Sequence, residues 1–304
     1  MSLKFYRTEF PTELRKRIMA GDPEVTCQEP YRVAPHVWMV SGHVDQSDFL
    51  IDTGDGLILI DTPVPAWEKY LFESIRKVGY DPKDIKLLLI SHEHFDHDGC
   101  AAAIKAASGC KIMMSEQAWY AKTHFVERAG STMGKYPQSP YYEPDEFYAD
   151  DKPITLGKFT IRTKWTPGHA PGVTSFFFDD TDDETGKTYH VAMHGGMGID
   201  AMRPDRCGYP GYATKEQRDM FIDQCYEMAM YDVDITLASH SNQGNINANI
   251  PEDRNDYSVF VDPRAWPVIL LERRARIMEF RCGGNTVYGD EKFNPVNIPK
   301  EEGK

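Results

Sequence analysis

Residues 91–99 read Ser-His-Glu-His-Phe-Asp-His-Asp-Gly and come directly after the apolar run Leu87–Ile90. The stretch places three imidazoles and a carboxylate within six positions, at His92, His94, Asp96 and His97. These side chains are ligands for zinc, iron or manganese, and two metals can share one loop when alternate side chains point to different sides. The pattern therefore predicts a metal site where a buried strand ends.

Two further histidines follow predicted strands. His169 lies in Thr-Pro-Gly-His-Ala-Pro-Gly (166–172), and His240 lies in Leu-Ala-Ser-His-Ser (237–241). Taken alone, each is more typical of a hydrogen-bonded histidine at a strand end than of a ligand. Because loops on a rigid sheet are the usual place for ligands, the two histidines and the first cluster together supply six, enough for two metals with room for water.

This constellation resembles the metallo-β-lactamase superfamily, whose signature is His-x-His-x-Asp-His after a strand, then a later Gly-His and a final His. The resemblance covers roughly residues 31–282 and includes Leu-Ile-Asp-Thr at 59–62. It implies an α/β fold, a four-layer αβ/βα sandwich with two mixed β-sheets flanked by helices. We expect an N-terminal extension over 1–30, one domain over 31–282 with an insert at about 118–152, and a tail over 283–304.

The resemblance also implies a ligand set. His92, His94 and His169 would bind one zinc, and Asp96, His97 and His240 would bind a second. The pair would activate a water that attacks a carbonyl, which makes Asp96 a catalytic residue as well as a ligand. The expected cofactors are two Zn²⁺, with iron or manganese as alternatives.

The chain departs from much of this family at His194. Glyoxalase-type, lactonase-type and RNA-processing members carry a metal-bridging aspartate here, whereas this chain reads Val-Ala-Met-His-Gly-Gly over 191–196. It therefore resembles the β-lactamase subclass with neither a bridging Asp nor a cysteine ligand. His194 is predicted to be catalytic, contacting substrate or donating a proton to the leaving group, or else to be structural. The glycines at 195 and 196 are interpreted as permitting close backbone approach.

Substrate contacts are predicted from two loops. Ser241 and Asn242 follow the last ligand and offer hydrogen bonds to an acyl or amide group, and Tyr141 belongs to a Tyr-rich insert predicted as a loop that covers the site. Asp61 has two open interpretations: a carboxylate that orients a ligand imidazole, or a cap of the turn at Pro63.

The leading hypothesis is a metal-dependent hydrolase acting on an amide, lactam, lactone or thioester of a small molecule, similar to a β-lactamase. Alternatives are lactonase or thioesterase activity like that of glyoxalase II, iron-dependent oxygen or redox chemistry, and a binding module without activity. The flavin-associated di-iron relatives have Glu at the position of His94 and an additional flavodoxin-like domain, and the sequence shows neither.

Composition limits the partners. A net charge of −13 argues against nucleic acid and anionic membranes, since phosphate binding needs clustered Lys and Arg. Residues 1–21 contain no apolar segment long enough for a signal peptide or membrane span, so a cytoplasmic location is expected, and an oligomer stays open. The six cysteines lie far apart and are predicted to be free thiols.

The coarse secondary structure comes in two comparable sets. The apolar runs 49–51 and 57–60 flank Asp-Thr-Gly-Asp-Gly and predict a hairpin. The other predicted strands and helices are strands over 37–40, 87–90, 111–114, 159–165, 173–178, 189–193 and 235–238, and helices over 66–78, 99–107, 214–230 and 263–281.

Overall fold

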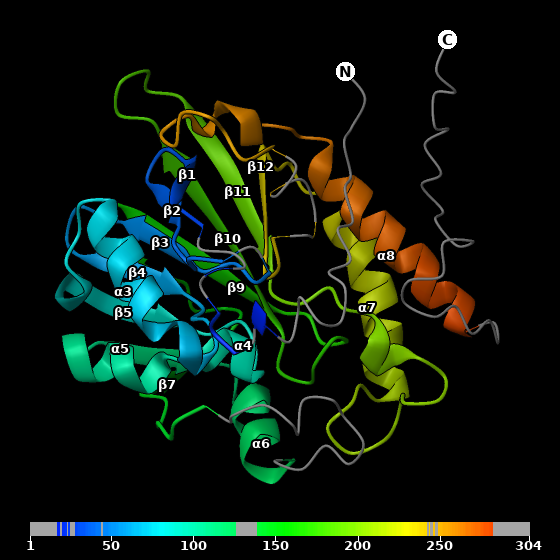
Figure 1. Cartoon of the computed structure of the whole chain (residues 1–304). Helices are drawn as coiled ribbons and strands as arrows, with labels where there is room; N and C mark the ends of the chain where they lie inside the picture. Colours follow the sequence, from blue (N-terminus) through cyan, green and yellow to red (C-terminus); the bar gives the residue numbers. More distant parts are fainter. Residues whose placement is uncertain are drawn as a thin grey trace.

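The computed structural model describes residues 17–18, 20–22, 24, 28–43, 45–125, 139–241, 243, 246 and 249–281. These residues form two β-sheets with helices on their outer faces (Figure 1). The seven-stranded sheet has the order β1 (Tyr31–Ala34), β2 (Val37–Met39), β3 (Phe49–Asp52), β4 (Leu57–Ile60), β5 (Ile85–Leu89), β6 (Lys111–Met114) and β7 (Glu146–Phe147). The five-stranded sheet has the order β12 (Ile235–Ala238), β11 (Thr188–His194), β10 (Thr174–Thr181), β9 (Phe159–Trp165) and β8 (Ile154–Leu156).

Both sheets are mixed. Strands β1 to β4 pair antiparallel, and β4 to β7 pair parallel. Parallel neighbours need a crossover, which here contains a helix in each case. The crossover helices are α3 (Glu68–Lys77), α5 (Ala101–Ser108) and α6 (Glu116–His124). In the second sheet β12 is parallel to β11 and is reached through α7 (Lys215–Met228), while α8 (Ala265–Arg281) follows β12.

Three apolar clusters lie between adjacent layers of secondary structure, so the fold has four layers. One cluster joins the inner faces of both sheets, for example Ile60 with Phe176. A second packs the outer face of the first sheet against α3 and α5, and a third packs the second sheet against α7 and α8. Because side chains alternate along a strand, β11 contributes Met193 to the central cluster and Ala192 to the helical one. The predicted four-layer αβ/βα sandwich is confirmed.

Several predicted elements are confirmed with small shifts. The 49–60 hairpin forms, and β12 has the predicted bounds. The helix predicted over 99–107 begins at Ala101, after a separate helical turn, α4 (Phe95–Asp98), and ends at Gly109 with φ +69°. Thr214 caps α7 through a reciprocal capping box with Gln217.

The prediction of an uninterrupted loop over 118–152 is wrong at both ends. Helix α6 extends to His124, and Glu146–Phe147 pairs with β6 as the edge strand β7. Residues 126–138, which include Tyr136 of the Tyr-rich segment, lie outside the described residues.

Two further sequence predictions concern the cysteines and membranes. The four cysteines in the described part are free thiols, and Cys27 and Cys282 lie outside it. No helix within the described residues combines the length and apolarity that crossing a membrane requires. The predicted cytoplasmic location stays a prediction.

Candidate metal centre

The His-rich loop leaves the middle of the first sheet and is fixed on both sides. Strand β5 lies between β4 and β6, so the chain emerges from a buried strand end at Ile90. Ser91 donates to the Asp61 carboxylate from both its backbone N–H and its hydroxyl, each at 2.6 Å. The Ser91 carbonyl accepts from the N–H of Thr174 at 2.8 Å, which ties the loop to the second sheet. The ligand loop is thus held by both sheets.

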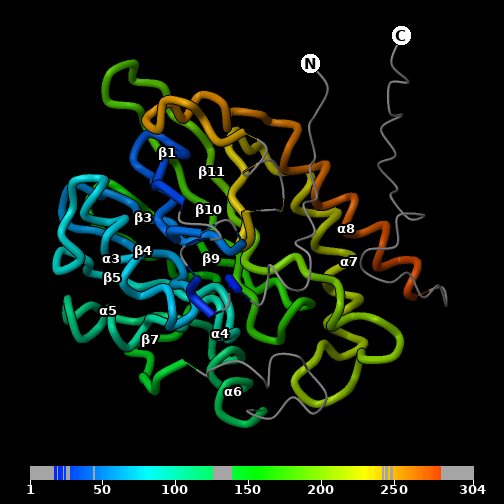
Figure 2. The backbone as a smooth tube through the Cα atoms, viewed as in Figure 1, coloured from blue at the N-terminus to red at the C-terminus, as the bar shows by residue number. Residues whose placement is uncertain are grey.

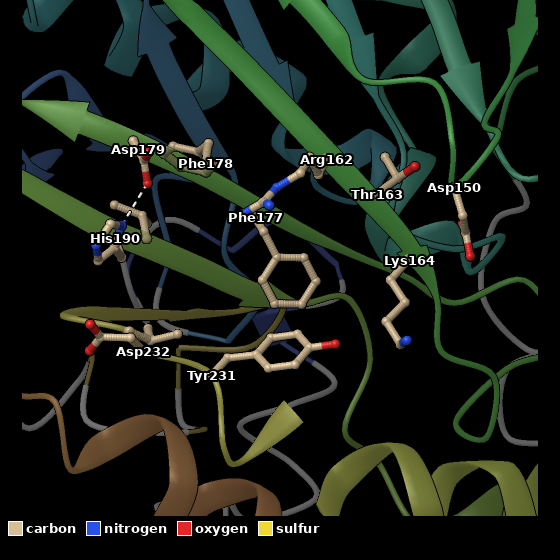
Figure 3. Close-up of a pocket in the computed structure, with 12 residues that line it drawn as sticks. Asp150, Arg162, Thr163, Lys164, Phe177, Phe178, Asp179, His190, Tyr231 and Asp232 are labelled. Atoms are coloured by element: carbon tan, nitrogen blue, oxygen red, sulfur yellow. Dashed lines mark hydrogen bonds and ion pairs between the residues drawn. The ribbon is translucent and has the colours of Figure 1, made fainter. Parts of the chain in front are cut away.

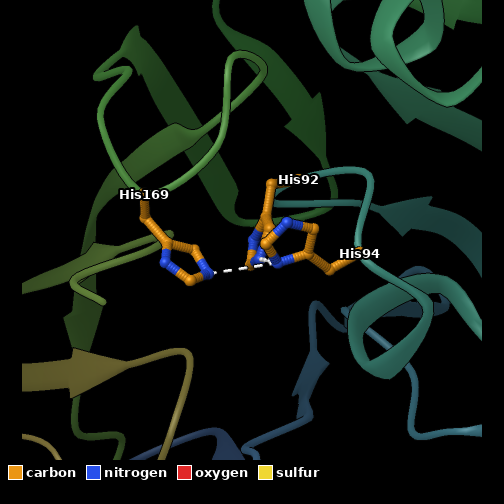
Figure 4. Close-up of side chains that lie close together, drawn as sticks. All are labelled: His92, His94 and His169. Atoms are coloured by element: carbon orange, nitrogen blue, oxygen red, sulfur yellow. Dashed lines mark hydrogen bonds between the residues drawn. The ribbon is translucent and has the colours of Figure 1, made fainter. Parts of the chain in front are cut away.

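Three histidines converge beside this loop (Figure 4). His92 and His94 come from the loop itself and His169 from the β9–β10 connection. Nδ1 of His94 lies 3.1 Å from Nε2 of His92 and 3.1 Å from Nε2 of His169. Tetrahedral zinc with Zn–N bonds of about 2.0–2.1 Å separates its nitrogen ligands by roughly 3.3 Å, so the spacing fits a shared ion.

A second group forms from Asp96 and His97 on α4 and His240 after β12. The Nε2 atoms of the two histidines lie 3.3 Å apart, and Oδ2 of Asp96 lies 3.9 Å from His97 Nε2 and 3.8 Å from His240 Nε2. The rings of His92 and His97 stand 4.1 Å apart between centroids, which makes the two groups neighbours. The six predicted ligands are therefore brought together in the two predicted sets of three.

The opposite ring nitrogens also have partners. Nδ1 of His92 lies 3.0 Å from the Ser91 hydroxyl, and Nδ1 of His169 lies 3.2 Å from the Gly198 carbonyl. Nδ1 of His97 lies 3.0 Å from Asp61 Oδ2. Such contacts set the tautomer, so that the other ring nitrogen is the one turned toward a metal. The donor set is nitrogen and oxygen only, and it fits a divalent metal.

Asp61 is the residue on which this support depends. Of its two predicted interpretations, the structure supports orientation of a ligand imidazole, since its carboxylate accepts from Ser91 and His97. Its φ of +62° is the only positive value among the non-glycine residues that the structure describes. Backbone strain of this kind persists where the surroundings over-determine it, commonly at functional sites.

The electrostatics differ between the two groups. Burial, together with the neighbouring imidazoles of His97 and His94, holds the pKa of His92 well below its usual range. Burial also opposes protonation of His97, but the Asp96 carboxylate and the hydrogen bond to Asp61 outweigh it and raise the pKa to about 9. The negative charge is thus concentrated around the second group.

His194 is in neither ligand group. It ends β11 on the face of the sheet that packs against the helices, with its ring 5.7 Å from that of Phe221 on α7 and Nδ1 accepting from the Gly196 N–H at 3.2 Å. Burial, with the positive charge of Arg273 adding to it, lowers the pKa of His194 to about 3. These contacts suit the structural alternative, and the catalytic role stays a prediction.

The predicted substrate residues have different surroundings. Ser241 is buried and its hydroxyl donates to the Asp45 carbonyl at 3.1 Å, while Asn242 lies outside the described residues. Tyr141 is 74% exposed and donates to Glu143. Its neighbour Tyr142 is buried and donates to Asp98 on α4 at 2.7 Å, so the insert packs against the helical turn that carries two ligands. The role of these residues in binding substrate stays a prediction.

The interpretation of the glycine pair is confirmed. A Cβ at Gly195 would lie 2.0 Å from the Thr174 carbonyl oxygen and 3.0 Å from Ser91 Cβ. One at Gly196 would lie 3.0 Å from the His169 ring. Since Thr174 also holds the ligand loop, the bare backbone at 195 lets β11 close against both.

A cavity of about 530 Å³ lies elsewhere, on the outer face of the second sheet (Figure 3). Arg162, Lys164 and Phe177 line it from β9 and β10, and Tyr231 closes one side with its ring 5.5 Å from Phe177. None of its lining residues is one of the six ligands. The cavity is therefore separate from the candidate metal centre.

Two partners of the candidate ligands were not predicted from the sequence. One is the Gly198 carbonyl, which no side-chain pattern reveals. The other is Asp45, whose Oδ1 lies 3.4 Å from Nδ1 of His240. The available signal was the polar stretch Ser-Gly-His-Val-Asp-Gln-Ser-Asp over 41–48 between two apolar strands.

Two mixed sheets in a four-layer sandwich, with six nitrogen and oxygen ligands at the strand ends, define a class of metal-binding αβ/βα proteins. The family model described as "Metallo-beta-lactamase superfamily" matches residues 42–183. Over this stretch, a little under half of its length, the chain is similar to the metallo-β-lactamase superfamily.

Solved structures share the fold over most of the chain. BJP-1, a subclass B3 metallo-β-lactamase of Bradyrhizobium japonicum, aligns with a TM-score of 0.74 at 21% identity, covering 87% of this chain and 97% of that one. A β-lactamase from Chitinophaga pinensis aligns with a TM-score of 0.73 at 26% identity, covering 90% and 97%. GOB-18 of Elizabethkingia meningoseptica aligns with a TM-score of 0.72 at 25% identity, covering 93% and 99%.

Curated relatives match over shorter stretches. The N-acyl homoserine lactonase AttM of Agrobacterium fabrum is 28% identical over 127 residues, 40% of this chain and 46% of the relative. The probable metallo-hydrolase YqgX of Bacillus subtilis is 25% identical over 147 residues, 47% of this chain and 65% of the relative. The chain thus spans between about half and two thirds of the length of these relatives.

Proposed function

We propose that this protein is a dinuclear zinc hydrolase that cleaves an amide, lactam, lactone or thioester carbonyl of a small molecule. The observation that carries the proposal is the pair of ligand groups, three histidines beside an Asp-His-His set, with the His92 and His97 rings 4.1 Å apart. Zinc bound there would supply a water of lowered pKa and polarise the substrate carbonyl.

The chain's own residues would hold and orient this centre. His92, His94 and His169 would bind the first ion, and Asp96, His97 and His240 the second. Ser91 and Asp61 fix the imidazoles of His92 and His97 by hydrogen bonds to Nδ1. Because these partners are buried, the ligand atoms are set before a metal arrives, which lowers the cost of organising the site.

The leading substrate is a β-lactam. The β11 end supplies a histidine under α7 at the position where other branches of the family carry a bridging carboxylate, and the ligand set consists of His and Asp alone. The solved structures with this architecture include β-lactamases. A lactone is the second candidate, because curated relatives with matching sequence are named as lactonases.

Measuring hydrolysis of a panel of β-lactam, lactone and thioester substrates tests the proposal. Protein loaded with zinc should hydrolyse at least one β-lactam, lactone or thioester, and Asp96→Ala should lower kcat/KM by at least about 10³-fold. The exposed turn variant Asp55→Ala is the control and should retain wild-type activity. Hydrolysis that survived loss of Asp96, with the second metal absent, would contradict the proposed two-ion mechanism.

A further inference from the structure

The described residues 41–43 and 45–48 of the β2–β3 connection are mostly polar and yet buried. Ser41, His43, Asp45, Gln46, Ser47 and Asp48 are each at most 3% exposed. Burying polar groups costs free energy unless they make compensating interactions. Because these polar groups are buried beside a candidate ligand site, the loop is a candidate for positioning the ligands.

Backbone hydrogen bonds join this loop to the segment that carries His240. Ser47 N–H donates to the Ser239 carbonyl at 2.9 Å, and Ser241 N–H donates to the Asp45 carbonyl at 2.9 Å. The Ser241 hydroxyl donates to the same carbonyl at 3.1 Å. Asp45 is therefore held in register with His240 by bonds on both sides of the ligand.

The Asp45 carboxylate faces the ring nitrogen of His240 that is turned away from the ligand group. Oδ1 lies 3.4 Å from Nδ1, and the two side chains are 4% and 12% exposed. Nε2 of the same ring faces Asp96 and His97. This repeats the arrangement at His97, where Nδ1 faces Asp61 and Nε2 faces the group.

The first group has different support. Nδ1 of His92 faces the Ser91 hydroxyl and Nδ1 of His169 faces the Gly198 carbonyl, both neutral oxygens. A carboxylate behind an imidazole raises its basicity as a ligand more than a neutral acceptor does. Both histidines of the second group have a carboxylate behind them, and that group also contains the anionic ligand Asp96.

We infer that Asp45 is a positioning residue for His240 and that the Asp96–His97–His240 site consequently binds its metal more tightly and fills before the three-histidine site. The inference rests on the proposed dinuclear centre and adds an order of loading to it. Asp45 touches neither substrate nor metal in this account, because it acts through His240.

Stepwise metal titration tests the affinity. Metal-free protein is titrated with Zn²⁺ or Co²⁺ against a chelator, which gives two dissociation constants. Asp45→Asn keeps the shape but removes the charge, and it should weaken the tighter step by about 10- to 100-fold and leave the weaker step unchanged. Asp45→Glu should restore part of the loss, and Asp55→Asn, in an exposed turn, should change neither step.

Double variants show which of the two metal sites Asp45 affects, and single variants show which site fills first. In an Asp96→Ala background the second site is already lost, so Asp45→Asn should have no further effect on the remaining affinity. With one equivalent of Co²⁺, the visible spectrum of the wild type should match His92→Ala, which retains only the second site, and not Asp96→Ala. Retention of the unaffected step in each variant shows that the chain is still folded.

The outcomes separate the two proposals. Wild-type protein that binds no metal would overturn the dinuclear centre itself. Two bound metals with an Asp45→Asn variant indistinguishable from wild type, or weakened equally at both steps, would overturn only the role of Asp45. First occupancy of the three-histidine site would overturn the order of loading.

Discussion

At the scale of single residues, the site depends on which buried groups have charged partners. Asp61 contacts Ser91 and His97 at once, so a single carboxylate sets both the course of the ligand loop and the tautomer of a ligand. His194 is the opposite case, a buried imidazole against Phe221 that is held neutral. The position of His194 in the sequence suggested a catalytic role, whereas its buried surroundings are typical of a structural role.

The lowered pKa of His194 makes a pH-dependent prediction. The unfolded chain takes up a proton near pH 6.5 and the folded chain only near pH 3, so stability falls as pH drops between these values. From pH 7 to 5 this one group should cost about 2 kcal/mol. Between pH 7 and pH 5, the unfolding free energy of His194→Gln should fall by less than that of the wild type. Urea denaturation at both pH values measures the difference.

The same variant separates the two roles of His194. A structural histidine predicts that His194→Gln keeps the shape of the kcat pH profile even if the protein is less stable. Loss of kcat by a factor of about 10² or more, with an unchanged fold, would instead support the proton donor predicted from the sequence.

At the scale of elements, close approaches position the ligand loop. The end of β11 presses against β10 and the loop at Gly195, where a Cβ would meet the Thr174 carbonyl oxygen at 2.0 Å. A backbone oxygen cannot rotate away, so an added side chain must move a strand. Since Thr174 N–H also holds Ser91, that movement is transmitted to His92.

Gly195→Ala should therefore destabilise the protein by roughly 2–4 kcal/mol and reduce its metal content. Gly186→Ala is a matched control: its φ is +71° but nothing lies near the added Cβ, so only backbone strain of about 1–2 kcal/mol is expected. Chemical denaturation and metal analysis measure both effects. An equal loss of unfolding free energy in the two variants would show that the structure accommodates a Cβ at residue 195 without strain.

The elements that the sequence predicted are those with strong local patterns. Strand β12 is a four-residue apolar and β-branched run, Ile-Thr-Leu-Ala, and its predicted bounds agree with the structure. Helix α6 buries only Ala118 and Ala121, so its apolar stripe was too weak to distinguish from the aromatic-rich loop that follows. Strand β7 has two residues and exists through its pairing with β6, which no local pattern reveals.

As with the secondary structure, only part of the candidate site could be predicted from the sequence. The spacing of His and Asp in the sequence is enough to recognise candidate ligands, and the structure brings all six of them together in two groups of three. Their supporting partners were harder, because Asp45 meets His240 across nearly two hundred residues and the Gly198 carbonyl has no side-chain signal. Tertiary contacts of this kind are invisible to periodicity.

At the scale of the whole molecule, the candidate metal centre lies where the two sheets meet. The first sheet supplies the ligand loop and α4, and the second supplies the loops that carry His169 and His240. Ions bound there would cross-link the two halves. Metal binding should therefore appear in the global stability and not only in activity.

Removing metal should lower the melting temperature. A ligand at 100 times its Kd stabilises by about 2.7 kcal/mol, which for a domain of this size corresponds to roughly 5 °C for each site. Differential scanning calorimetry with zinc and with chelator measures the shift, and Asp96→Ala should show a smaller shift than wild type. An identical melting temperature under both conditions would mean that neither site binds tightly.

The most direct test of the proposed dinuclear centre is anomalous X-ray diffraction at the zinc edge from crystals of the zinc-loaded protein. Two anomalous peaks are expected, one among His92, His94 and His169, the other among Asp96, His97 and His240. A single peak, or peaks outside these two groups, would contradict the proposed centre.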